Sequence, residues 1–241
     1  MKNTQDIPWI RITAEATAVL ASILLAFAID AWWVERLERV AEREELSRLH
    51  QEFASNYERI DSWVSDGGII SRAREAALSV SEALDAALKG GSETVSLADL
   101  QIAEILQTPT FEAESPVFES LVRSGRIEII ENREIVKAIA IWERSLRGSA
   151  DLEQRGLRFV YEQLLPALAV NNNIQHIFLN QWPPVQVVPI DPSGFAEIGV
   201  EPLLVNLVAQ RYFQIAMIHQ SLITVRDSSA QVMSTITKTI E

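Results

Sequence analysis

The sequence has no cysteine among its 241 residues and only three histidines. A chain without thiols cannot form disulfides, use a thiolate nucleophile or hold zinc or an iron–sulfur cluster through cysteine. The histidines, His50, His176 and His219, lie far apart in the sequence, so they do not show the spacing of a metal-binding motif. We therefore expect neither a resident metal nor a cofactor.

Positive charge is also scarce. Lysine and arginine together number 21, against 33 aspartate and glutamate residues, which gives a formal net charge of −12. A surface of this sign repels phosphate groups, so we expect no nucleic acid among the partners. Hydrophobic residues make up 48% of the chain and charged residues 22%, a balance typical of folded proteins rather than disordered ones.

The common sequence motifs of catalysis are missing. The chain contains no G-x-x-x-x-G-K-[ST], no G-x-G-x-x-G, no H-E-x-x-H and no G-x-S-x-G. We therefore predict that the protein is not an enzyme. The alternative is an active site assembled only by folding, with His176 or His219 placed beside carboxylates.

Two short patterns suggest binding sites, and each has a plainer interpretation. Ser124-Gly125-Arg126 has the form of an anion-binding turn, but a junction between two helices accounts for it equally well. Glu128, Glu131 and Glu134 form an acidic cluster, but arginines lie among them, which is typical of a solvated helix start. His219 lies beside an apolar stripe, which favours a hydrogen-bonded core histidine over a catalytic base.

The most informative segment is apolar and lies near the N-terminus. Residues 12–34, preceded by a short tail at 1–11, contain 14 consecutive uncharged residues at 16–29. As a helix, residues 12–34 rise about 34 Å, which is enough to cross a hydrocarbon core of about 30 Å. We predict a single membrane-spanning helix at 12–34, with the lipid bilayer as a partner. A cleaved signal peptide and a core helix of a soluble domain are the alternatives.

Tryptophans bound this segment, and two acids interrupt it. Trp9 precedes the segment, and Trp32 and Trp33 close it, as expected of indole rings at the headgroup level. On a helix, Glu15 and Asp30 point about 60° apart and so lie near one face. Acids in a membrane segment usually face a partner, a cavity or the interface. We take Glu15, Asp30, Trp32 and Trp33 as candidate partner-binding residues; the alternative is that both acids lie at the membrane boundaries.

The rest of the chain has the pattern of a helical protein. Apolar residues continue at helical spacing from Leu37 to Val64, so we expect the anchor to run into a juxtamembrane helix that ends near Gly67-Gly68. Further helices are expected at 69–89, from Ser96 to about Gln107, from Pro116 to Ser124, after Asn132, and from Pro202 almost to the C-terminus, with a break near Gly148, Gly156 or Pro166. The predicted fold class is all-α: a membrane-spanning helix that continues into a juxtamembrane helix, followed by an antiparallel helical-bundle domain within 35–241.

Residues 171–201 differ in character from their surroundings. This segment holds four of the nine prolines, and it is too apolar for a solvated linker. We expect an irregular, proline-rich segment that either packs over the helical domain or forms an arm that docks on a partner. In the second case Phe178 and Trp182 are the candidate contact residues.

Two stretches together carry a family resemblance. Ala14-Glu15 begins the apolar segment and Asp30-Ala31-Trp32 ends it, while Leu121-Val-Arg-Ser124-Gly125-Arg-Ile127 precedes a helix. Both stretches resemble a widespread bacterial family of single-span membrane proteins known only as a domain of unknown function, in which Gly-Glu stands at the start of the span. The resemblance implies an anchored helical domain on the periplasmic side of the inner membrane, without a known activity or cofactor. The arginine count, higher after the span than before it, favours the cytoplasmic side instead.

These observations predict a non-catalytic, membrane-anchored helical protein. It would serve as an accessory, structural or scaffolding subunit of a bacterial membrane assembly, such as a respiratory or photosynthetic one. Its partners would be the bilayer and either other membrane-protein subunits or further copies of itself. A membrane-tethered sensor or ligand-binding module is the alternative, because a continuous juxtamembrane helix is suited to transmitting a signal.

Overall fold

The structure, a computed structural model, describes residues 9–172, 174, 177 and 194–240. Helix accounts for 83% of the described residues and strand for 5%, so the prediction of a mainly helical protein with a long N-terminal helix is confirmed. The described elements are α1 (Trp9–Val64), α2 (Ile69–Gly90), β1 (Thr94–Ala98), α3 (Asp99–Leu106), α4 (Pro116–Arg123), the 3-10 turn η1 (Arg126–Ile129), α5 (Arg133–Phe159), the π-helical turn η2 (Val160–Leu164), α6 (Leu165–Asn171), β2 (Phe195–Gly199) and α8 (Pro202–Ile240).

Helix α1 has 56 residues and is therefore about 84 Å long. It runs without interruption from the apolar segment into the domain, as the helical spacing predicts, and ends just before a glycine pair. Gly67 has φ 78°, and a Cβ on Gly68 would lie 2.4 Å from the carbonyl oxygen of Trp63. Only glycines fit this turn, so the pair separates the end of α1 from the start of α2 at Ile69.

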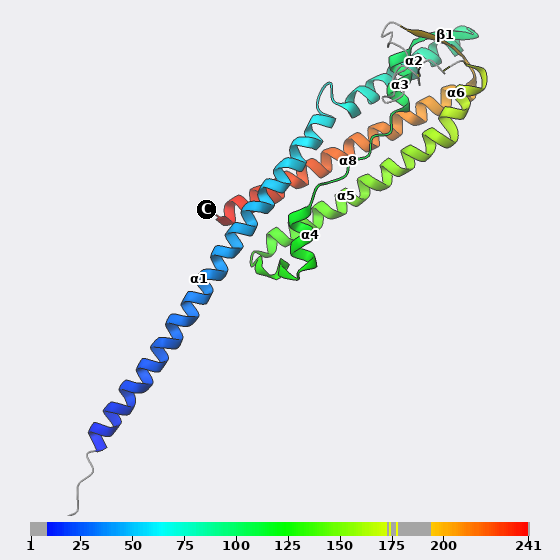
Figure 1. Cartoon of the computed structure of the whole chain (residues 1–241). Coiled ribbons are helices and arrows are strands. Elements are labelled where there is room, and N and C mark those ends of the chain that lie inside the picture. Colours follow the sequence, from blue (N-terminus) through cyan, green and yellow to red (C-terminus); the bar gives the residue numbers. More distant parts are fainter. Residues whose placement is uncertain (1–8, 173, 175–176, 178–193, 241) are drawn as a thin grey trace, which may run out of the picture.

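Helix α8 lies at the centre of the domain and packs against α5, α1 and α2. Figure 1 shows α8 running back from the far end of the molecule, so that it ends beside the middle of α1. Its buried apolar residues follow the predicted stripe: Leu204, Val208, Ile215, Ile218, Leu222, Val225, Val232 and Ile236. The first apolar residue of α1 that enters this core is Leu46, and the preceding part of α1 extends away from the domain.

A two-stranded antiparallel sheet closes the end of the domain farthest from the free part of α1 (Figure 1). The prediction that Ser96 starts a helix is wrong, because Ser96 pairs with Glu197 in the sheet and α3 begins at Asp99. Residues 195–199, expected to be irregular, form β2. The pairing turns Leu97 and Ile198 into the core, and such a contact between distant segments leaves no local trace in the sequence.

The expected break in the second half of the chain is a change of helix type. Helix α5 continues through both Gly148 and Gly156, and the π-helical turn η2 follows at Val160–Leu164. Pro166 lies just beyond this turn and has no N–H to donate to the preceding turn, which favours a local irregularity. A Cβ on Gly156 would lie 3.1 Å from Nη1 of Arg211, so this glycine lets α5 approach α8 closely.

Candidate membrane-contacting surface

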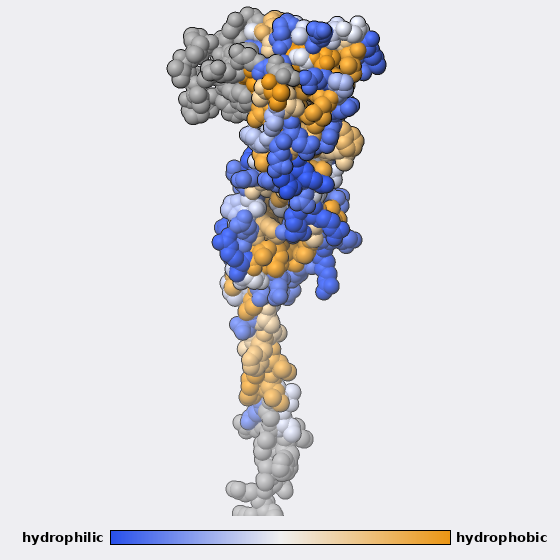
Figure 2. Space-filling model, turned by 90° about the vertical axis from the view of Figure 1, so that its right-hand side faces the viewer, coloured by the Kyte–Doolittle hydropathy of each residue, from blue (hydrophilic) through white to orange (hydrophobic). Residues whose placement is uncertain are grey.

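The first half of α1 is an apolar rod that the domain does not cover. Every described side chain from residue 17 to residue 40 is exposed. Its large apolar side chains include Val19, Leu20, Ile23, Leu24, Leu25, Phe27 and Ile29. In Figure 2 this rod projects from a domain whose visible face mixes hydrophilic and hydrophobic areas, and the part of the rod next to the domain is mainly coloured as hydrophobic.

The apolar side chains of this rod point in all directions around the helix axis. At about 100° per residue, the seven residues named above leave no gap wider than about 100° around the circumference. A helix that is apolar on all sides is stable in a protein core or in a membrane. Within the described part of the chain, one helix is long and apolar enough to cross a membrane; it lies near the N-terminus, its 18-residue window has a mean hydropathy of 1.9, and none of that window is buried.

Trp32 and Trp33 lie where the apolar rod gives way to charged residues. Both rings are about half exposed, at 51% and 54%, and their centroids are 6.3 Å apart. The guanidinium of Arg36 lies 5.7 Å from the centroid of the Trp32 ring. An indole beside a cation is the arrangement expected at the headgroup level of a bilayer.

The candidate partner-binding residues are not brought together into one site. Glu15 and Asp30 are both exposed on α1, about 60° apart around its axis and about 22 Å apart along it. Phe178 and Trp182 lie outside the described residues, so their role as contacts stays a prediction. His176 also lies outside the described residues.

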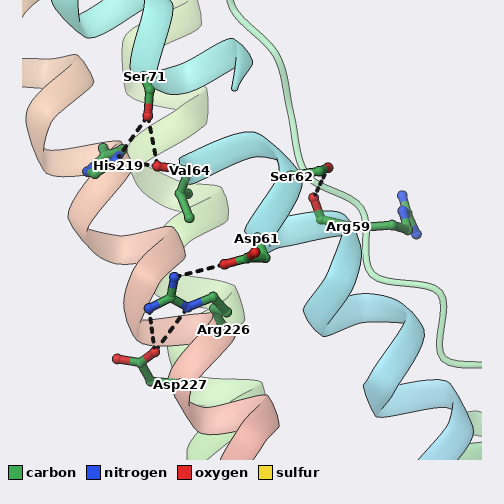
Figure 3. A network of polar contacts seen from close by, with 8 residues as sticks. All are labelled: Arg59, Asp61, Ser62, Val64, Ser71, His219, Arg226 and Asp227. Atoms are coloured by element: carbon green, nitrogen blue, oxygen red, sulfur yellow. Dashed lines mark hydrogen bonds and ion pairs between the residues drawn. The ribbon is translucent and has the colours of Figure 1, made fainter. Parts of the chain in front are cut away.

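His219 lies at the junction between α8 and the end of α1 (Figure 3). Its Nε2 is 3.1 Å from the carbonyl oxygen of Val64, and the hydroxyl of Ser71 donates to the same oxygen at 2.7 Å. Carbonyl groups in the last turn of a helix lack donors within the helix, so the two side chains cap α1. This is the hydrogen-bonded histidine that the sequence favours: within the described part of the chain its Nε2 has the Val64 carbonyl and the Ser71 hydroxyl as neighbours, and no carboxylate.

Arg226 joins α8 to α1 one level below this cap (Figure 3). Its guanidinium bonds Asp61 of α1 and Asp227 of its own helix, each at 3.0 Å. Hydrogen bonding to Asp227, followed by Asp61, raises the pKa of Arg226, so this cation stays charged. The polar groups at the junction therefore fix α1 against α8.

A cleft of about 440 Å³ opens where α1 leaves the domain. It is lined by Glu38, Ala41, Glu42, Ser124, Gly125, Arg126, Glu128, Ile129 and Glu131. The carboxylate of Glu42 accepts a bond from the backbone N–H of Glu131, and Arg126 pairs with Glu45 at 3.2 Å. Gly125 has φ 71° between α4 and η1, so the predicted turn is a junction between helices. The described residues contain no group of three or more side chains suited to a metal ion.

Two buried charged residues, Arg211 and Glu153, were not identified from the sequence. Arg211 is 2% exposed and donates to the carbonyl oxygens of Ile105 at 2.9 Å and Gln107 at 2.6 Å. Burial lowers the pKa of Arg211 to about 10, still far above neutral pH. Glu153 on α5 accepts bonds from the backbone N–H of Phe111 and the hydroxyl of Ser149, both at 2.9 Å, and burial raises its pKa.

These two side chains hold the segment after α3 against α5 and α8. The sequence carries one clue to this role, because Arg211 is the lone charge between Glu201 and Arg226. A single cation in an otherwise apolar helix must find acceptors when the helix is buried. Which carbonyl groups accept its hydrogen bonds depends on the folded chain.

Comparisons with protein-family models, with curated proteins and with solved structures find no match. The exposed apolar half of α1 is thus the feature of the molecule on which a functional assignment rests.

Proposed function

We propose that residues 12–34 of α1 anchor the protein in a bilayer as a single span, and that the protein acts without catalysis as an accessory or scaffolding subunit of a membrane assembly. The observation that carries this proposal is that a helix with apolar side chains on all sides is exposed at every residue from 17 to 34. Exposed apolar patches of more than a few hundred Å² mark a contact with protein or membrane. The span continues into the domain through one uninterrupted helix.

The energy of insertion favours the bilayer. The seven large apolar residues between Val19 and Ile29 contribute about 2–4 kcal/mol in total on an insertion scale of 0.3–0.6 kcal/mol each. An aspartate at the bilayer centre costs about 2.5–3.5 kcal/mol on the same scale, which would cancel this gain. Asp30 lies beside the tryptophan pair near one end of the span, where the cost is smaller.

Residues 35–241 form, in this proposal, one extramembrane antiparallel helical-bundle domain. The packing of α8 against α5, α1 and α2 supports this assignment. Buried polar side chains, including Arg211 and Glu153, hold backbone groups of the chain itself, which supports a structural role over a catalytic one. The proposed location is the bacterial inner membrane with the domain in the periplasm, in line with the resemblance of the span to single-span bacterial proteins.

A membrane-tethered sensor or ligand-binding module is the second candidate. The cleft of about 440 Å³ supports it, because this cleft lies against α1 at the level of Glu38 and Glu42. A ligand in the cleft would contact both η1 and the helix that leads to the membrane. Saturable binding of a small molecule that is lost in the Glu42→Arg variant would favour this candidate over a scaffold.

Membrane extraction tests the anchor. We expect the intact protein to stay with membranes after alkaline carbonate washing, and the double variant Leu20→Lys, Leu24→Lys to be released, because each lysine costs about 2.5–3.5 kcal/mol near the bilayer centre. The matched control is Leu78→Lys with Leu88→Lys, two exposed leucines of α2 in the domain, which should leave the protein in the pellet. Release of the unmodified protein would disprove the anchor.

A further inference from the structure

Three turns of α1 just beyond the tryptophans separate apolar and charged side chains onto opposite faces. At about 100° per residue, Leu37, Val40 and Ala41 fall within an arc of about 100°. The charged residues fall within a separate arc of about 160°: they are Glu35, Arg36, Glu38, Arg39, Glu42 and Arg43. Leu37 and Val40 are 54% and 49% exposed, so this apolar face has no cover within the described part of the chain.

The domain cannot cover this face, because it packs on the other side of the helix. The core residues Leu46, Leu49 and Phe53 point in the same direction as the charged arc, about 150° away from Leu37. The helix is continuous through this region, so the directions of its faces are fixed relative to one another. The apolar face of Leu37 and Val40 is therefore turned away from the domain.

Asp30, inside the anchor, lies on the same face. It points about 20° from Leu37 around the axis. The face continues through Trp33, Leu37 and Val40, at the alternating spacing of three and four residues that is typical of a heptad repeat. The first two cations that follow Asp30 in the sequence have other partners: Arg36 lies over Trp32, and Arg39 pairs with Glu35 at 3.3 Å. One face of α1 thus combines an acid within the span with an apolar stripe outside it.

Three kinds of occupant could lie on this face, and they differ in whether they cover Leu37 and Val40 and in whether they offer Asp30 a partner of opposite charge. Lipid tails end near the tryptophans, so they would leave Leu37 and Val40, which lie beyond the span, uncovered. A second copy in a parallel, two-fold pair would cover Leu37 and Val40 but would place its own Asp30 against the first, where like charges repel. A helix of another membrane protein with a lysine or arginine at the depth of Asp30 satisfies both parts, because polar side chains join helices within membranes.

We propose that this face of α1, formed by Asp30, Trp33, Leu37 and Val40, docks a membrane-spanning helix of another protein that carries a basic residue opposite Asp30. This inference rests on the proposed anchoring function and names the chemistry of the partner. Charge complementarity selects the partner, and the apolar stripe beyond the membrane extends the contact by two turns. The domain, on the opposite face, does not obstruct the approach.

Energy transfer in vesicles tests the proposal with a defined probe. The full chain contains no native cysteine, so a donor dye is placed on Ser47→Cys, an exposed position next to the face. The probe is a synthetic leucine-rich spanning peptide with an acceptor dye, an apolar stripe that continues two turns past the span, and one lysine at the depth of Asp30. A matched peptide has leucine at that position. Flotation of the protein with phosphatidylcholine vesicles is measured first.

We expect the lysine peptide to bind roughly three- to thirtyfold more tightly than the leucine peptide, the range of polar contacts between helices in membranes. Asp30→Asn should remove this preference, and Asp30→Lys should transfer it to a peptide with aspartate. Leu37→Ser with Val40→Ser should weaken both peptides equally, whereas Glu38→Gln on the opposite face should change neither.

The other outcomes overturn the proposal in distinguishable ways. A protein that floats with vesicles but binds both peptides equally, or neither, is anchored without a basic helical partner. Energy transfer between two labelled copies of the chain, lost on Leu37→Ser with Val40→Ser, would make a second copy the occupant of this face. A protein that does not float would overturn the anchor together with the partner.

Discussion

The two halves of α1 share one continuous helix and have opposite surroundings. Side chains 17–40 are exposed on every side, whereas Leu46, Leu49, Phe53 and Ile60 on the second half are at most 1% exposed. The same residue types thus serve two purposes on one helix. In the second half they stabilise the fold, and in the first half they contribute nothing to it and are available to an external apolar phase.

Two phenylalanines on this helix should show the largest difference. Phe53 is 1% exposed and makes an edge contact with Trp142, with ring centroids 4.8 Å apart, while Phe27 is 68% exposed. We expect Phe53→Ala to lower the free energy of unfolding by about 3–5 kcal/mol through loss of burial and creation of a cavity. Phe27→Ala should change it by less than about 0.5 kcal/mol. Urea denaturation of the full chain in detergent, followed by tryptophan fluorescence, measures both; equal effects would contradict the division of α1.

The acids of the two halves should differ as well. Glu52 accepts hydrogen bonds from the backbone N–H groups of Val117 at 2.6 Å and Phe118 at 3.2 Å, so it caps the start of α4. We expect Glu52→Ala to destabilise the domain by about 1–2 kcal/mol, the usual effect of losing a helix cap. Glu58→Ala on the exposed side of the same helix is the control, and Asp30→Ala in the free half should leave domain stability unchanged. A stable Glu52→Ala variant would show that α4 does not depend on α1.

Local signals account for most of what the sequence predicts correctly. Pro116 at the start of α4, Asn132 as the cap of α5 and Gly91 at the end of α2 each act on their own neighbours in the chain, and each helix boundary follows. The pairing of β1 with β2, about a hundred residues apart, is decided by the folded core. The cap that Glu52 provides also depends on a distant segment.

Some features of the candidate site can also be predicted from local sequence, whereas others depend on the fold. The apolar length, the tryptophans and the position of Asp30 can be read from the sequence, because a single helix determines their relative positions. The direction of the apolar face relative to the domain cannot, since it depends on which side of α1 the other helices cover. Arg211 and Glu153 were missed for the same reason: their partners are backbone groups of a segment that is distant in the sequence.

Glu153 should make domain stability depend on pH, in contrast to the acids of the free half of α1. Burial raises its pKa above the ordinary value of 4.5, so the folded chain binds this proton more tightly than the unfolded chain. The folded state therefore loses stability as the pH rises from about 4.5 through the raised pKa, and Glu52 adds to this slope for the same reason.

Glu153→Gln keeps an acceptor for Phe111 and removes the titrating group. We expect a flatter pH dependence of the urea midpoint just above pH 4.5 in this variant, and unchanged or slightly higher stability at pH 7. Asp30→Asn should leave the pH dependence of the domain as it is. A slope that persists in Glu153→Gln at full strength would assign the effect to Glu52 or to other carboxylates.

The smallest expected difference in domain stability is between variants of two ion pairs of similar length. Glu35 and Arg39 pair at 3.3 Å within the free half, while Asp61 and Arg226 pair at 3.0 Å and join the second half of α1 to α8. Arg226 is 26% exposed and Asp61 42%, so water screens the pair and its contribution stays at about 0.2–1 kcal/mol. We expect Asp61→Asn to lower domain stability by that amount at low salt and by less at high salt, because added salt screens the attraction. Glu35→Gln should have no measurable effect at either salt concentration, since Glu35 and Arg39 both lie on the exposed first half of α1. A salt-dependent loss of domain stability in Glu35→Gln would show that the free half of α1 is coupled to the fold after all.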